Sequence, residues 1–120
     1  MLAVKIFYAL HTVYEAYAAY VNITNPVKFD PNPSIKWQGA LGFAQVSLAL
    51  LTALFLPDVA STIGAKVSAI AATFHVLVTA RMVLGTDPLK PVQFYSHLII
   101  CGCFVAHIVF VLLRVKKKPS

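Results

Sequence analysis

The chain has 120 residues, of which 59% are hydrophobic and only 12% are charged, and its mean hydropathy is +0.78. This composition excludes a water-soluble globular protein, whose surface needs many more charged residues. The net charge of +6 does not indicate nucleic-acid binding, because most of the basic residues adjoin the ends of apolar stretches, where they favour anionic lipid headgroups. We therefore expect an integral membrane protein with no nucleic-acid partner.

Four apolar stretches follow one another along the chain. They are Ala3 to Val21, Trp37 to Leu56, Gly64 to Leu84 and Val92 to Val115. Each has about 19 residues or more, which is enough for a helix rising about 1.5 Å per residue to cross roughly 30 Å of hydrocarbon. The connections between them all contain proline, which interrupts helices. The sequence predicts an all-α protein, with residues 1–120 forming a single transmembrane four-helix bundle.

The basic residues predict the orientation of these spans. An even number of crossings places both termini on one side of the membrane, and six basic residues fall on that side against four on the other. The six are Lys5, Lys66, Arg114, Lys116, Lys117 and Lys118. Because cytoplasmic loops carry an excess of Lys and Arg, we expect both termini to be cytoplasmic.

The C-terminal run Lys117-Lys118-Pro119-Ser120 resembles the dilysine retrieval signal of eukaryotic endoplasmic-reticulum membrane proteins. The alternative is a run of lysines that only stops transfer of the last span. The position of the lysines and the predicted cytoplasmic tail favour the retrieval signal. We expect a multi-pass protein of the endoplasmic-reticulum membrane.

Each span carries polar residues at a similar depth. Counted from the cytoplasmic ends at 1.5 Å per residue, His11 and His107 lie at roughly 12 Å, and Glu15, Gln45 and His75 at roughly 16 to 18 Å. The spacing of small and polar residues on each span predicts that these side chains face inward. We therefore predict one polar layer near the bilayer centre, to which all four helices contribute. By the same count, His97 lies near the luminal boundary and is interpreted as interfacial.

Glu15 is the most costly member of this layer. A carboxylate at the centre of a bilayer costs about 2.5 to 3.5 kcal/mol or more, so Glu15 has to be protonated, paired or exposed to a water-filled cavity. His11, one helical turn earlier on the same face, is the expected partner.

Three hypotheses account for the layer. It is a general acid/base site for a flat apolar substrate that enters from the lipid, a haem site ligated by two of its histidines, or a structural core that fixes helix register. For the first hypothesis the catalytic candidates are His11, Glu15 and His75, and the ligand-binding candidates are Gln45, His107 and Tyr14. Cys101 and Cys103 match no zinc-binding pattern, and we expect neither a metal site nor a cofactor.

A glycine-containing second span, Phe74-His75 midway through the third span, Gly85-Thr86 at its end and a dilysine tail form a pattern along the last two thirds of the chain. This organisation resembles the small four-helix endoplasmic-reticulum protein that scaffolds the enzymes of sterol C-4 demethylation. The resemblance implies a non-catalytic scaffold or accessory subunit of sterol or related lipid metabolism. Its partners would be the lipid membrane and other membrane enzymes, or further copies of the chain.

The His11 and Glu15 pair is also similar to a feature of the emopamil-binding sterol isomerase family, in which a membrane-embedded His and Glu one turn apart handle the substrate proton. This second resemblance implies an alternative function. The chain would then be a minimal intramembrane isomerase or cyclase that acts by proton transfer on a sterol-like or isoprenoid-like lipid.

Overall fold

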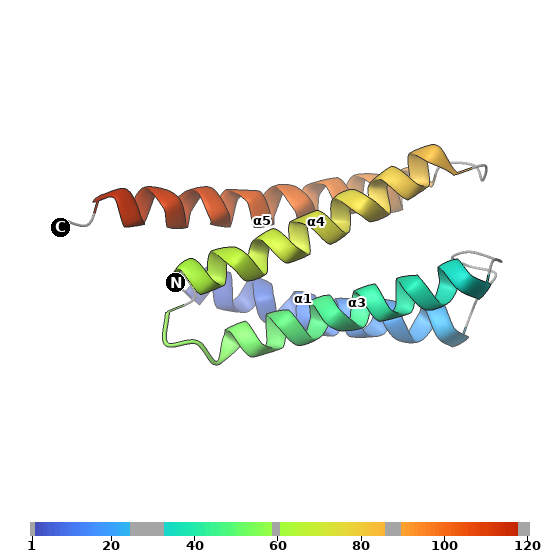
Figure 1. Cartoon of the computed structure of the whole chain (residues 1–120), viewed down its shortest axis with the longest axis horizontal. Coiled ribbons are helices and arrows are strands. Elements are labelled where there is room, and N and C mark those ends of the chain that lie inside the picture. Colours follow the sequence, from blue (N-terminus) through green and yellow to red (C-terminus); the bar gives the residue numbers. More distant parts are fainter. Residues whose placement is uncertain (1, 25–32, 59–60, 86–89, 118–120) are drawn as a thin grey trace. The chain divides into compact units, whose positions relative to one another are not determined.

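The computed structural model describes residues 2–24, 33–58, 61–85 and 90–117 of the chain. Most of these residues belong to four helices, α1 (Leu2–Thr24), α3 (Pro33–Leu54), α4 (Thr62–Leu84) and α5 (Pro91–Lys117), shown in Figure 1. The described part of the chain contains no β-strand. The predicted all-α class is confirmed.

The helices begin at residues whose chemistry suits a helix start. Pro33 and Pro91 open α3 and α5, because a proline in the first turn gives up no intrahelical hydrogen bond. Ser61 caps α4 by accepting a hydrogen bond from the backbone N–H of Gly64, at 3.3 Å. As a result, α3 begins four residues before the predicted Trp37, and α4 two residues before the predicted Gly64.

Three of the described helices, α3, α4 and α5, are long and apolar enough to cross a membrane. This supports the prediction of an integral membrane protein. The predicted first span, α1, is 23 residues long but carries Lys5, His11 and Glu15, and it is not one of these three. A fourth span and the side of the membrane on which the termini lie therefore stay predictions.

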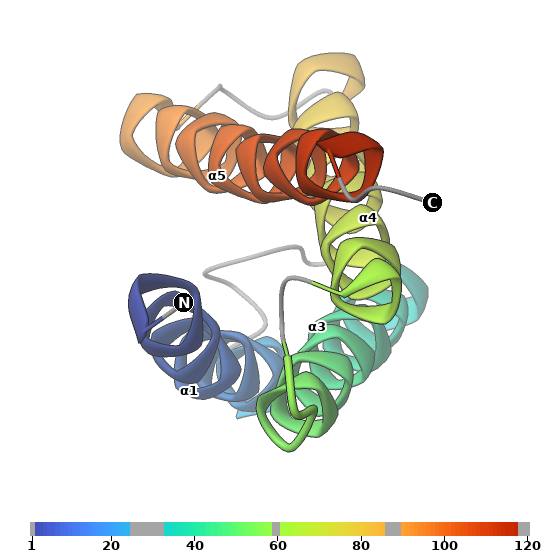
Figure 2. The same cartoon turned by 90° about the vertical axis from the view of Figure 1, so that its left-hand side faces the viewer.

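The helices form two compact units, Met1–Val59 and Ala60–Ser120. In the first, which we call the first hairpin, α1 packs against α3; in the second hairpin, α4 packs against α5 (Figures 1 and 2). The single four-helix bundle stays a prediction.

Two close contacts set the register of the first hairpin. The Ser47 hydroxyl of α3 donates a hydrogen bond to the backbone carbonyl of Thr12 in α1, at 2.7 Å. Nearer the other end, Asn22 of α1 lies so close to Gly39 of α3 that a Cβ at position 39 would be 3.2 Å from the Asn22 side-chain oxygen. Residue numbers rise along α1 as they fall along α3, so the helices are antiparallel, and a small residue permits their close approach.

The second hairpin has the same antiparallel arrangement. Ala65 of α4 packs with Val111 of α5 near one end, and the Cys101 thiol of α5 donates a weak hydrogen bond to the Ala72 carbonyl of α4, at 3.6 Å. Ala71 and Ala72 are both buried. Small residues on α4 therefore bring the two helices together, as membrane helices commonly do.

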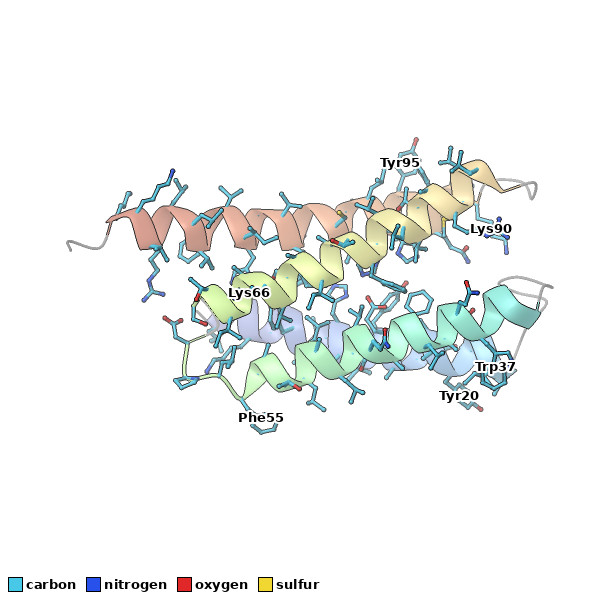
Figure 3. The ribbon with its side chains drawn as sticks, in the orientation of Figure 1. Tyr20, Trp37, Phe55, Lys66, Lys90 and Tyr95 are labelled. Carbon is cyan, nitrogen blue, oxygen red and sulfur yellow. The ribbon has the colours of Figure 1, made fainter. Side chains whose placement is uncertain are left out.

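Exposed aromatic side chains lie near both ends of the first hairpin. Figure 3 shows Tyr20 and Trp37 together at one end and Phe55 at the other, and all three are exposed. In the second hairpin, Lys66 and Lys90 lie near opposite ends. Aromatic and basic residues at helix ends are typical of segments whose ends meet the two membrane interfaces.

Candidate functional site

The structure brings His11 and Glu15 together on α1. The His11 Nδ1 lies 3.9 Å from the Glu15 Oε1, with 12% of the His11 side chain exposed and none of the Glu15 side chain. This separation is within the range of an ion pair but longer than a hydrogen bond. A buried carboxyl next to an imidazole provides a proton donor and a proton acceptor within one helical turn.

Aromatic rings border the His11 imidazole. The Phe7 ring meets it nearly edge-on, with the two ring centroids 4.4 Å apart, and the Tyr14 ring does so at 5.9 Å. Tyr14 is itself partly exposed. This predicted ligand-binding residue therefore lies beside the His11 imidazole.

Gln45 does not join this pair within the first hairpin. Its side chain is exposed, and the polar contact from α3 to α1 is made instead by Ser47, two positions later. The buried face of α3 carries Phe43, Val46 and Leu50, which follow the helical spacing that starts from Gly39. Gln45, which was predicted to face inward in the polar layer, is exposed and does not face α1, because the bulky apolar residues of α3 and its Ser47 contact determine which face packs on α1.

His107 is held by Ser68 across the second hairpin. The Ser68 Oγ and the His107 Nδ1 lie 2.7 Å apart, and both side chains are buried. The hydroxyl donates the hydrogen bond when Nδ1 is bare and accepts it when Nδ1 carries the proton. His107 therefore contributes directly to the packing of α5 on α4.

His75 is held by His97, a residue that the depth count had placed outside the layer. The two Nδ1 atoms are 2.7 Å apart, and the exposed fractions of the residues are 0% and 5%. The interpretation of His97 as interfacial is wrong. His75 lies nine residues before Leu84, the last residue of α4, and His97 lies six residues after Pro91, the first residue of α5. A count from the connection between these helices therefore places the two histidines at levels that differ by three residues, or about 4.5 Å.

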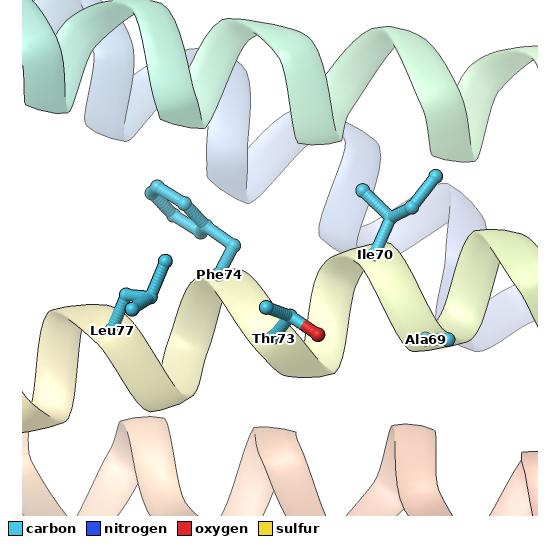
Figure 4. Close-up of a pocket in the computed structure, with 5 residues that line it drawn as sticks. All are labelled: Ala69, Ile70, Thr73, Phe74 and Leu77. Atoms are coloured by element: carbon cyan, nitrogen blue, oxygen red, sulfur yellow. The ribbon is translucent and has the colours of Figure 1, made fainter.

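A shallow, open hollow of about 360 Å³ lies on α4, lined by Ala69, Ile70, Thr73, Phe74 and Leu77 (Figure 4). At 100° per residue, these positions lie opposite the face that carries Ser68 and His75. None of the predicted site residues lines the hollow, and apart from the Thr73 hydroxyl its lining side chains are apolar. The hollow suits contact with apolar groups and offers no acid/base chemistry.

Within the hairpins, the contacts group the predicted site residues as follows: His11 with Glu15 and Tyr14, His107 with Ser68, and His75 with His97. The first group lies on α1, and the other two lie between α4 and α5. Within the described residues, no three side chains of His, Cys, Asp or Glu come together as a metal site would require. Whether all four helices share one polar layer stays a prediction.

Part of the pattern that suggested a family and a compartment lies outside the described residues. Thr86 belongs to one of these stretches, and residues 118–120 of the lysine-rich tail belong to another. Sequence and structure comparisons with known proteins give no matching family model, no matching curated protein and no matching solved structure.

Proposed function

We propose that this chain is a small membrane protein of the endoplasmic reticulum that supports sterol or related lipid metabolism as a non-catalytic scaffold or accessory subunit. The supporting observation is that its buried polar side chains form hydrogen bonds between helices. Ser47, Ser68 with His107, and His75 with His97 each connect two helices of one hairpin. Contacts of this kind fix the register of membrane helices and need no substrate.

The outer faces of the helices suit partners that are themselves within the membrane. Leu98, Ile99 and Leu112 of α5, among other large apolar residues, are exposed. Inside a bilayer such faces contact lipid chains or the helices of another membrane protein. The assignment to sterol metabolism and to the endoplasmic reticulum rests on the sequence resemblances.

The experiment that tests this proposal is purification of the full chain in a gentle detergent through an N-terminal tag, followed by mass spectrometry of the proteins and lipids that remain bound. We expect membrane enzymes of lipid metabolism in fixed proportion to the chain. An unrelated four-span protein of the same membrane, purified in parallel, controls for abundant contaminants. Recovery of the chain without such enzymes would overturn the scaffold proposal.

The compartment has its own test. Lys117→Ala combined with Lys118→Ala removes both lysines of the tail and leaves the rest of the chain intact. We expect this variant to leave the endoplasmic reticulum, whereas Lys116→Ala, the matched control one residue earlier, should stay. If the double variant stayed in the endoplasmic reticulum, the run of lysines would act only as a stop-transfer signal.

One observation favours a second candidate function. His11 and Glu15 place an imidazole beside a fully buried carboxyl on one face of α1, with Nδ1 and Oε1 3.9 Å apart. As an isomerase or cyclase, the pair would add a proton to one carbon of a sterol-like or isoprenoid-like lipid and remove a proton from another. The net composition of the substrate would be unchanged, so no cofactor would be consumed.

A further inference from the structure

We propose that His75 and His97 form a proton-binding site inside the second hairpin, in which the two imidazole rings share one proton and thereby connect α4 to α5. This inference is independent of the proposed scaffold function and of the His11 and Glu15 pair. It rests on the position, surroundings and chemistry of the two rings.

The contact between the rings requires a proton between them. Two nitrogen atoms 2.7 Å apart are at the short end of the hydrogen-bond range, and the contact is stable only if one Nδ1 carries a hydrogen and the other is bare. The neutral pair therefore contains two different tautomers. One ring has its proton on Nδ1 and donates it, while the other has its proton on Nε2 and accepts at Nδ1.

Two aromatic rings border the His75 imidazole. The Phe104 ring stacks nearly parallel to the His75 ring, with an interplanar angle of 16° and centroids 6.0 Å apart. Phe74 meets His75 edge-on at 5.7 Å. Both imidazoles are almost completely buried. In such a setting an added positive charge is stabilised chiefly by groups that touch it, since water does not solvate it.

The two described helices of the second hairpin supply no carboxylate that would provide that stabilisation. Neither α4 nor α5 contains Asp or Glu. The other titratable groups between the two helices are Cys101, which donates to the Ala72 carbonyl, and His107, which is bonded to Ser68. Lys66 and Arg114 lie towards one end of the hairpin, and Arg81 and Lys90 lie towards the other end. The second ring of the pair, whose Nδ1 is 2.7 Å away, stabilises a proton taken up here.

The protons balance in the following way. A proton that arrives at the bare Nε2 of the donor ring makes that ring an imidazolium, which donates its Nδ1 hydrogen more strongly to the neutral ring. That hydrogen can cross to the second Nδ1, and the second ring can then release its own Nε2 hydrogen. One proton enters, one leaves, and the two rings have exchanged tautomers.

A metal bridge does not fit the same geometry. Two nitrogen ligands of one metal ion are about 4 Å apart when they lie on opposite sides and about 3.3 Å apart in a tetrahedral site, because each metal–nitrogen bond is about 2.0–2.1 Å long. The Nδ1 atoms are only 2.7 Å apart, which leaves no room for an axial haem iron between them. The separation suits a shared hydrogen.

The pair should respond to acid in two steps. The first proton converts a neutral hydrogen bond into a charge-assisted one, which is roughly twice as strong. A second proton would place two imidazolium rings in contact with no hydrogen-bond acceptor between them, and so would separate the rings. The two residues should therefore titrate as a coupled unit rather than as two independent histidines.

Nuclear magnetic resonance of the full chain in lipid nanodiscs, with ¹⁵N-labelled histidine, tests this proposal. We expect scalar coupling across the hydrogen bond between the two Nδ1 nuclei. We also expect the His75 and His97 signals to move together as the pH falls from about 8 to about 4. In His97→Gln the coupling should disappear and His75 should titrate in one step. His107→Gln, which removes the other buried imidazole of α5, is the matched control and should leave the coupled titration in place.

Separate titration of His75 and His97 in the unsubstituted chain, with no coupling between their Nδ1 nuclei at any pH, would overturn the proposal. This outcome does not depend on the variants, so it stands even if His97→Gln does not fold. Loss of the coupled titration in His107→Gln, with that variant still folded, would also contradict it, because the site would then extend beyond the two rings.

Discussion

The histidines of this chain fall into two structural kinds. His11 lies beside Glu15 on its own helix, whereas His75 and His107 each contact a residue of the neighbouring helix. A contact between helices stabilises the packing of the hairpin. In the first hairpin, α1 packs on α3 through the Ser47 hydrogen bond and through apolar residues. The contacts between helices are structural by their position, whereas the His11 and Glu15 pair provides a proton donor and a proton acceptor within one helical turn.

The sequence predicted the His11 and Glu15 contact because a spacing of four residues alone places two side chains on one face of a helix. It did not predict the partner of His75, because the depths were counted from the cytoplasmic ends of the spans, and α5, with 27 residues, is longer than α4, with 23. Gln45 was misplaced for a different reason. A polar residue in a span suggests an inward face, but Gly39 and Ser47 contact α1 and turn Gln45 away from it.

Substitution of Glu15 distinguishes the two candidate functions. Under the scaffold proposal, Glu15→Gln should leave the sterol and isoprenoid composition of cells unchanged, because an amide fills the same volume and can still form hydrogen bonds. An acid/base enzyme would instead lose activity by about 10²- to 10⁴-fold. The measurement is mass spectrometry of lipids from cells in which the variant replaces the original chain. Tyr20→Phe, at an exposed position near the end of α1, is the control. A fall in one product with its precursor accumulating, at unchanged protein level, would favour the enzyme.

At the scale of helices, length and composition predicted most of the fold. Every predicted span became a helix, and α4 ends at Leu84 as predicted. The starts of α3 and α5 depend on Pro33 and Pro91, residues that interrupt a helix in its middle but fit its first turn. The pairing of α1 with α3 and of α4 with α5 agrees with the short connections, but the register within each pair depends on individual contacts.

The contact of Ser68 with His107 should contribute measurably to the stability of the second hairpin. Hydrogen bonds between membrane helices contribute about 0.6 kcal/mol on average and at most about 1.7. We expect a double-mutant cycle of Ser68→Ala and His107→Phe to give a coupling energy in this range, measured as the free energy of unfolding in mixed detergent micelles. Ser96→Ala, which removes a hydroxyl bonded to the Val92 carbonyl of its own helix, is the control and should show no coupling with His107→Phe. Strict additivity of the two substitutions would mean that the 2.7 Å contact does not stabilise the hairpin.

At the scale of the whole molecule, the open question is whether α1 crosses the membrane. Its Lys5, His11 and Glu15 make it less apolar than the other helices. Its packing nevertheless argues for a crossing. Residues 12–22 of α1 run antiparallel along residues 39–47 of α3, a helix that is apolar enough to span the bilayer. A helix attached to α3 over this length extends through the same depth, and at 23 residues it is about 35 Å long.

We therefore expect four crossings with both termini on one side. In sealed membrane vesicles, with Cys101 and Cys103 replaced by serine, single cysteines at Lys5, Asp58 and Lys116 should react with a membrane-impermeant maleimide from the same side. A cysteine at Lys90 should react only from the other side. If α1 did not cross, the number of crossings would be odd, because α3, α4 and α5 would be the only spans. A cysteine at Lys5 would then share the side of Lys90, opposite Asp58 and Lys116, and the four-span architecture would be wrong.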